Sequence, residues 1–206
     1  NILSTTTLSA STGIFRQSPE YLWLTSDIRN KNLDFIKADH FVLGLEHLFT
    51  PELRFSIEAY YKNYSNYPVS TLVPTYVLIG AGTENGPNLL CGEAVSEGKG
   101  YSKGIDISIH KKLTGNGIYG MINYSLSESK VEGLAGGLKP GSFDYRHNLT
   151  IIAGYQLAND WLIGLKFRYT TGRPFTPFDP VLSTYAGRGV SDFSNFNGTR
   201  FKDYNR

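Results

Sequence analysis

The sequence predicts an all-β protein, specifically a transmembrane antiparallel up-and-down β-barrel. Three observations support this prediction. Long segments alternate apolar and polar residues with a period of two, which is the pattern of a strand with two unlike faces. Short and long connections alternate strictly along the chain. Aromatic residues are frequent, with 14 Tyr and 12 Phe against 2 Trp, and suit strands better than helices.

Seven alternating segments are expected to form strands, and an eighth begins near Tyr204. They are about eleven residues long, whereas a globular strand usually has about five or six. At about 3.3 Å per residue and a tilt near 45°, eleven residues rise about 25 Å, which matches the core of a bilayer. The seven segments are residues 4–17, 39–49, 53–64, 101–111, 117–128, 146–157 and 161–171.

The alternation gives each segment an apolar and a polar face. It is weakest in the first segment, is interrupted by His47 in the second, and is regular from the third onward. The apolar faces comprise, in chain order, Leu8, Ala10, Thr12 and Ile14; Phe41, Leu43, Leu45 and Phe49; Phe55, Ile57, Ala59 and Tyr61; Ile105, Ile107 and Ile109; Ile118, Gly120, Ile122, Tyr124 and Leu126; Leu149, Ile151, Ala153 and Tyr155; and Trp161, Ile163, Leu165, Phe167 and Tyr169.

The connections indicate the orientation. Long structureless loops argue against a compact soluble domain, but in an outer-membrane barrel short turns face the periplasm and long loops face outside. Because lipid cannot hydrogen-bond a free strand edge, we expect residues outside this chain or a partner segment to close the sheet. Short turns are expected at 50–51, 113–116 and 158–160, and long loops at 18–38, 66–100, 129–145 and 172–203.

Aromatic rings gather at the ends of the predicted strands, where amphipathic rings favour the membrane–water interface. A tyrosine-rich soluble sandwich is the alternative, and the strand length and the loop asymmetry count against it. The rings in question are Tyr60, Tyr61, Tyr64 and Tyr67 at the outer end of the third segment, and Trp161 and Tyr169 at the inner and outer ends of the seventh.

Composition and motifs argue against several classes of function. The formal net charge is +2 with no long basic run, so we expect no nucleic-acid partner. Cys91 is alone, so no disulfide can form within the chain. The four histidines, at 40, 47, 110 and 147, do not pair at a metal-ligand spacing, and no hydrolase or phosphate-loop motif appears. We expect no enzyme activity, catalytic residue, metal or cofactor.

Polar residues opposite the apolar face are candidates for the barrel lumen, where they would set selectivity or meet a plug. A hydrated charge network without a ligand role is the other interpretation. The lumen-facing candidates are Arg54, Glu58, Lys62, Asp106, His110, Arg146, Lys166 and Arg168. Four aromatic residues of the outer loops could contact an extracellular ligand, or instead anchor the interface or pack the loops: Tyr21, Trp23, Tyr76 and Tyr185.

Four motifs, in this order and spacing, resemble the late barrel strands of TonB-dependent outer-membrane receptors. Each motif alone is weak, but the four together cover nearly the whole chain. They are EAYYKNY at 58–64, GIDI at 104–107, SFDYRH at 142–147 and TGRPFTPF at 171–178. Residues 202–206, KDYNR, are similar to the opening of the next strand in that family.

The resemblance implies a 22-stranded barrel in the outer membrane of a Gram-negative bacterium, with the lipid bilayer as a partner. Residues 1–206 would be the C-terminal portion of its barrel domain, without the plug domain through which the TonB complex acts. The implied function is TonB-dependent transport of a scarce ligand, namely an iron chelate, cobalamin or an oligosaccharide. The alternatives are a small eight-stranded barrel with an adhesin or structural role, and a soluble sugar-binding sandwich.

Overall fold

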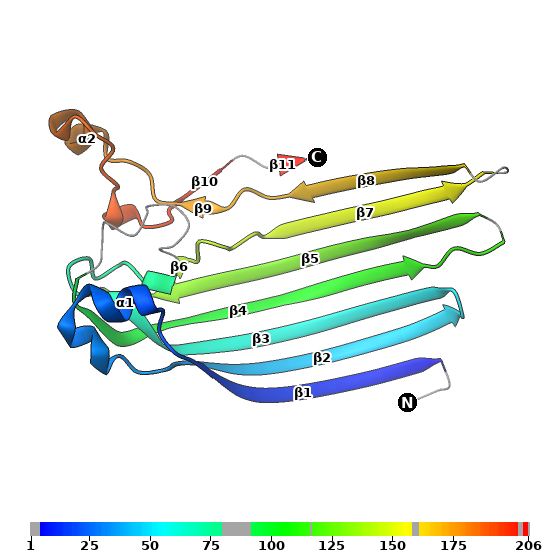
Figure 1. Ribbon diagram of the computed structural model, residues 1–206, viewed down its shortest axis with the longest axis horizontal. Helices are drawn as coiled ribbons and strands as arrows, with labels where there is room; N and C mark the ends of the chain where they lie inside the picture. The colour runs from blue at the N-terminus through cyan, green and yellow to red at the C-terminus, as the bar shows by residue number, and fades with distance from the viewer. Residues whose placement is uncertain (1–4, 80–91, 116, 158–160, 202–203, 206) are drawn as a thin grey trace.

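The computed structural model is one wide antiparallel sheet whose strands follow one another in chain order (Figure 1). It describes residues 5–79, 92–115, 117–157, 161–201 and 204–205. The short β6 (Lys139–Pro140) pairs with β5 beside the main path. Along that path lie β1 (Thr6–Gln17), β2 (Ile36–Thr50), β3 (Leu53–Ser70), β4 (Ala94–Lys111), β5 (Ile118–Glu132), β7 (His147–Gln156), β8 (Leu162–Thr170) and β11 (Tyr204–Asn205).

The predicted all-β barrel wall is confirmed, with all seven strands and the start of an eighth in place. The largest difference is in β3 and β4, which are 18 residues each and take in parts of the predicted loop at 66–100. At about 3.3 Å per residue and a 45° tilt, such a strand rises about 40 Å, more than a bilayer core requires. If the sheet crosses a bilayer, the loop end of this hairpin therefore projects beyond it.

Short turns and long connections lie at opposite ends of the sheet, here called the turn end and the loop end (Figure 1). The predicted loops at the loop end contain regular structure. Besides a two-stranded sheet, their described residues include two short α-helices and two 3-10 helices, and none of the described helices is long and apolar enough to cross a membrane. These elements are α1 (Tyr21–Ser26), η1 (Ile28–Asn32), β9 (Pro174–Phe175), α2 (Pro180–Ala186), η3 (Phe193–Asn195) and β10 (Thr199–Arg200).

Local chemistry sets the limits of α2. The Asp179 side chain accepts a hydrogen bond from the Leu182 N–H at 2.8 Å, and Pro180 occupies the first turn. The helix ends at Gly187, whose φ of 62° is readily adopted by glycine.

Cys91 and the turn predicted at 158–160 lie outside the described residues.

The strand register gathers the predicted apolar faces onto one side of the sheet, since directly opposed residues share a face. Ile105 and Ile109 are 41% and 39% exposed, so no second layer of described residues covers this side. One continuous row across six strands consists of Leu45, Ile57, Ile107, Tyr124, Leu149 and Tyr169.

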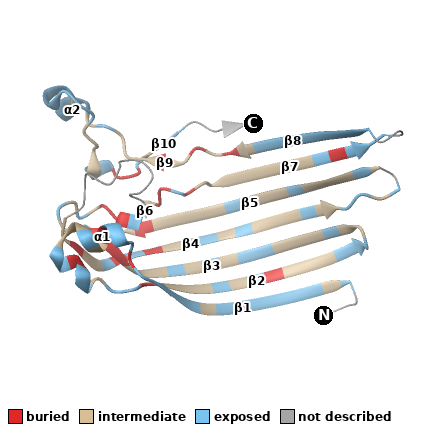
Figure 2. Ribbon diagram, in the orientation of Figure 1, coloured by how far each residue is buried: buried red, intermediate tan, exposed pale blue. Residues whose placement is uncertain are grey.

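The buried hydrophobic residues lie at the loop end instead of beneath the sheet (Figure 2). They form a small core in which the connections pack on the extensions of β3 and β4. Its members are Trp23, Ile36, Tyr67, Val69, Tyr76, Val77, Leu78, Ala94, Val131 and Phe196. The loops are thus held as a folded layer over one end of the sheet.

Candidate functional site

The polar strand faces form the second side of the sheet. Glu58 stands directly opposite Asp106, and Arg54 directly opposite His110, across the β3–β4 pair. Ladder positions on β7 and β8 continue the same rows. Seven of the eight lumen candidates therefore share one side, opposite the apolar rows: Arg54, Glu58, Lys62, Asp106, His110, Lys166 and Arg168.

Arg146 departs from the expected position. Its guanidinium contacts Glu128 at 2.9 Å, and Glu128 stands opposite Lys103 on the side that carries the apolar rows. The physical reason is that β7 begins only at His147, so Arg146 precedes the regular ladder and its side chain reaches across the strand end. The alternation of the strand interior therefore does not predict the side on which such a residue lies.

Contacts among the polar residues are loose and solvated. The Arg54 guanidinium lies 3.5 Å from the Glu46 carboxylate, and both side chains are nearly half exposed. The Lys62 ammonium lies 5.2 Å from the centre of the Tyr60 ring. Exposed pairs of this kind contribute about 1 kcal/mol or less, so these two contacts do not hold the side chains rigidly.

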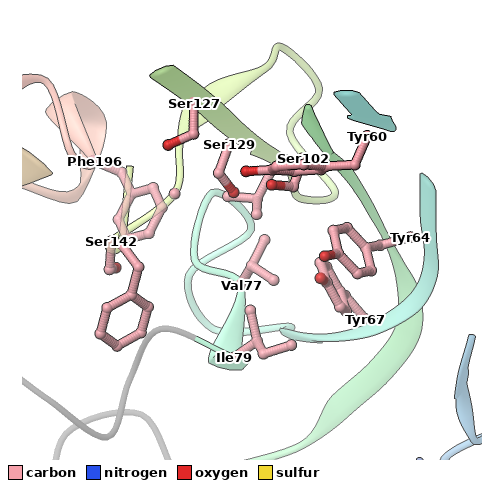
Figure 3. Close-up of a pocket in the computed structure, with 13 residues that line it drawn as sticks. Tyr60, Tyr64, Tyr67, Val77, Ile79, Ser102, Ser127, Ser129, Ser142 and Phe196 are labelled. Carbon is pink, nitrogen blue, oxygen red and sulfur yellow. The ribbon is translucent and has the colours of Figure 1, made fainter. Parts of the chain in front are cut away.

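A pocket of about 340 Å³ opens on the polar side at the loop end (Figure 3). We call it the mouth pocket. The strands provide one wall, and residues from three connections provide the other. It is lined by Tyr60, Tyr64, Tyr67, Val77, Ile79, Ser102, Ser127, Ser129, Val131, Gly141, Ser142, Phe143 and Phe196.

The lining of the mouth pocket is uncharged and rich in hydroxyl groups and aromatic rings. Tyr64 and Tyr67 stack with their ring centres 5.3 Å apart. Burial raises the pKa of Tyr67 above its usual range, so its phenol stays protonated as a neutral group. Such a lining offers apolar ring faces and neutral hydroxyl groups, which suit a planar or polyhydroxylated ligand better than a bare ion.

The sequence predicted that four tyrosines at the end of β3, at positions 60, 61, 64 and 67, lie at the membrane–water interface. The structure keeps only Tyr61 on the apolar side, while Tyr60, Tyr64 and Tyr67 line the mouth pocket. The alternation in 53–64 already assigned Tyr60 to the polar face, and Tyr64 has the same parity. The turn of Tyr67 into the pocket follows irregular pairing between Tyr64 and Val69, which the sequence pattern does not reveal.

The four aromatic loop candidates divide into two pairs. Trp23 and Tyr76 are 5% and 4% exposed and belong to the loop core, where Tyr76 packs edge-on against Phe193 and Phe196. They therefore pack the loops, the alternative that the sequence left open. Tyr21 in α1 and Tyr185 in α2 are 79% and 94% exposed and remain accessible to a ligand.

Asn30 is the main polar clamp between loops. It is fully buried, and its amide donates to the carbonyl oxygens of Trp23 at 2.8 Å and Gly92 at 2.9 Å. Its side-chain oxygen accepts from the Ala94 N–H at 2.8 Å. These bonds tie the β1–β2 connection to the start of β4.

Asp144 forms a second clamp. Its side chain is fully buried, accepts the Ser129 N–H at 2.9 Å, and pairs with Arg200 and, at 3.3 Å, with Arg146. Arg200 also donates to the Asp144 carbonyl oxygen at 2.7 Å. The carboxylate therefore joins the β5–β7 connection to the segment that includes β10.

Among the described residues, no group of three or more His, Cys, Asp or Glu side chains could hold a metal.

Comparisons with known proteins agree with this geometry. The family model described as "TonB dependent receptor-like, beta-barrel" matches residues 4–205. A search of curated proteins finds no match.

Three solved structures illustrate the fold similarity. The ferripyoverdine receptor of the outer membrane of Pseudomonas aeruginosa superposes with a TM-score of 0.66 at 16% identity, over 98% of this chain and 24% of its own. The FrpB iron transporter of Neisseria meningitidis gives 0.66 at 14% identity, over 100% of this chain and 29% of its own. The ferric-catecholate import receptor Fiu of E. coli K12 gives 0.60 at 13% identity, over 85% of this chain and 24% of its own. The chain spans about a quarter of the length of these proteins.

Proposed function

Because the chain belongs to the β-barrel family of TonB-dependent receptors, we propose that it forms part of the wall of a transporter for a scarce ligand. The family consists of outer-membrane receptors of Gram-negative bacteria and is not a class of enzymes. The observation that carries the proposal is the family match over 4–205, which includes the whole described sheet. We further propose that this chain is the C-terminal portion of the barrel domain.

An open sheet supports this proposal over the small eight-stranded barrel. Within the described residues β1 pairs only with β2, and β11 pairs only with β8, so the path has two free edges. Free edges cannot face lipid, because each unpaired backbone group would cost several kcal/mol there. Further strands on both sides would satisfy them, as in a larger barrel.

The polar side of the sheet then lines the lumen, with the mouth pocket at its external entrance. The seven polar candidates would contact water or a plug domain along the barrel, and Tyr21 and Tyr185 would meet ligand in the loops. A plug outside this chain would connect the barrel to the TonB complex and so to the proton-motive force. The transport step therefore needs parts that these residues do not supply.

We infer that the ligand is an iron chelate. Two supports point this way: the similar structures include a ferripyoverdine receptor, a ferric-catecholate import receptor and an iron transporter, and the mouth pocket offers stacked rings and neutral hydroxyls. Cobalamin and oligosaccharides remain the competing ligand classes. Their binding would leave the transporter proposal intact and overturn only the choice of ligand.

The test uses the full-length protein and two measurements. Binding is measured by fluorescence titration with a ferric catecholate, ferric pyoverdine, cyanocobalamin and a maltooligosaccharide, and uptake is measured in cells with and without TonB. We expect saturable binding of a ferric chelate, and uptake that stops when TonB is absent or the proton gradient is collapsed. Tyr64→Ala should weaken binding by roughly fivefold, given about 1 kcal/mol for an aromatic contact. Uptake that continues unchanged without TonB would contradict the proposal.

A further inference from the structure

We propose that the apolar side of the sheet binds a phosphorylated glycolipid of the outer leaflet through a cluster of basic residues at the loop end. We call this group the rim cluster: the basic residues Lys103, Lys130 and Arg146, together with Glu128 and Tyr101. The proposal depends on the membrane location and not on the identity of the transported ligand.

Register places the rim cluster at the border of the apolar rows. Lys103 stands opposite Glu128, and Tyr101 stands opposite Lys130, across the β4–β5 pair. Lys103 precedes Ile105 by two residues, so it lies on the same side of the sheet and closer to the loops. The apolar series of β4 therefore ends where the rim cluster begins, which is the level of the lipid headgroups on the external side.

The rim cluster has an excess of positive charge. The Glu128 carboxylate accepts the Tyr101 hydroxyl at 2.6 Å and lies 2.9 Å from Arg146, 3.1 Å from Lys130 and 4.0 Å from Lys103. Three cations thus surround one carboxylate. The nearby carboxylate of Asp144 pairs with Arg146 at 3.3 Å and also with Arg200, and because Arg200 balances the charge of Asp144, the excess of two positive charges remains.

The cations are accessible while the carboxylate is withdrawn. The side chains of Lys103, Arg146 and Lys130 are 51%, 36% and 34% exposed, whereas Glu128 is 18% exposed. Glu128 therefore holds the three cations in one place and leaves their outer faces open. An anion approaching from the headgroup layer meets cationic nitrogens before it meets the carboxylate.

The chemistry of the surface selects a lipid over a free anion. Guanidinium and ammonium groups bind phosphate oxygens through charge-assisted hydrogen bonds. Directly below the cations, Ile105 and Leu126 are 41% and 38% exposed and can contact an acyl chain. Tyr61 and Tyr101 stack 6.1 Å apart at the same level, where amphipathic rings are favoured. A phosphorylated glycolipid has both the anionic head and the chains that this surface fits.

The experiment measures retention of a diphosphorylated glycolipid by the full-length protein with native mass spectrometry and with titration in detergent. The test variant is the double substitution Lys103→Gln and Lys130→Gln. The control is Lys62→Gln, which removes one positive charge on the polar side of the sheet, where Lys62 stands opposite Ser102. Lys103→Arg with Lys130→Arg keeps the charge and checks that the sites tolerate substitution.

We expect the double glutamine variant to bind the glycolipid at least about tenfold more weakly, since each basic residue near an anionic lipid surface adds to the free energy of binding. The Lys62→Gln and double arginine variants should bind as the unmodified protein does, and the dephosphorylated glycolipid should bind weakly to all. Equal binding by the double glutamine variant, or equal loss in Lys62→Gln, would overturn the proposal. Competition by inorganic phosphate at the concentration of the lipid would overturn it too, by indicating a site for the free anion.

Discussion

Charging the middle of an apolar row should destabilise the protein far more than charging the adjacent residue on the polar side. Ile107 is the best position for this comparison, because it lies midway along the apolar series of β4. Lys103 and Lys111, which share its side, are each four residues away. At about 3.3 Å per residue and a 45° tilt, Ile107 lies about 9 Å in depth from each of them.

The expected magnitude follows from that depth. Arginine at the midplane of a barrel's lipid face costs about 2–4 kcal/mol, and the cost falls to about 0–1 kcal/mol near the interfaces. Ile107→Arg should therefore lower the free energy of unfolding by about 2–4 kcal/mol. The matched control Ser108→Arg faces the polar side. There the main loss is the 2.7 Å hydrogen bond from Ser108 to Asn123. We expect that loss to cost about 1 kcal/mol.

The assay is reversible unfolding of the full-length protein in phospholipid vesicles, with urea as denaturant and tryptophan fluorescence as the signal. Midpoints are compared at a common slope, since a change in slope would report a change in the exposed surface. Asp106→Asn provides a mild substitution on the polar side of the same strand. Equal destabilisation by Ile107→Arg and Ser108→Arg would refute the assignment of the two sides.

Three further predictions concern the loop end. Asn30→Ala should lower local stability by about 1–3 kcal/mol, because three backbone groups lose their buried partner. Hydrogen exchange of residues 71–79 and 92–94 should become faster, and unchanged exchange would argue against the clamp. Asp144→Asn should cost about 2 kcal/mol, less than for a fully buried pair because Arg200 is partly exposed; limited proteolysis after residue 172 provides the readout. Hydrogen bonds from the Arg29 side chain lower the pKa of Asp27 to about 2. The contribution of Asp27 to η1 should therefore be complete above about pH 4 and be lost as the pH falls through about 2. Amide protection in 28–32, taken relative to the intrinsic exchange rate at each pH, should fall over this range, and constant protection would contradict the prediction.

The strands could be predicted because lipid imposes a simple pattern. Where one side meets hydrocarbon and the other meets water, as in residues 101–111, every second residue is apolar and the alternation alone fixes the strand and its sides. The extensions of β3 and β4 lack this pattern. Val69 and Ser70 are both fully buried, because loops cover the hairpin on both sides outside the membrane. Alternation therefore ends at the membrane boundary although the strand continues.

The candidate site was predictable only in part, for related reasons. The positions of Glu58 and Asp106 could be predicted from the alternation alone, because both residues lie inside a regular strand ladder. Trp23 and Tyr76 are aromatic residues in long loops, which made them candidates for ligand contact. They are buried through contacts between connections that lie far apart in the sequence, and the sequence pattern does not reveal such contacts. Arg146 precedes its strand by one residue, so an ion pair with Glu128 decides its direction and the period of two does not.

The most direct measurement of the central claim, that the apolar rows contact lipid, is a spin-label scan of positions 103–110 in the full-length protein in vesicles. Single cysteines are introduced into a Cys91→Ser background, and collisions are recorded with oxygen, which concentrates in lipid, and with a water-soluble nickel chelate. We predict that labels at 105, 107 and 109 respond mainly to oxygen and that labels at 106, 108 and 110 respond mainly to the nickel chelate. Position 104 is left out because a Cβ there would lie 2.7 Å from the Leu126 carbonyl oxygen. Equal response to the two reagents at all positions, or shielding of 105, 107 and 109 from oxygen, would contradict the account.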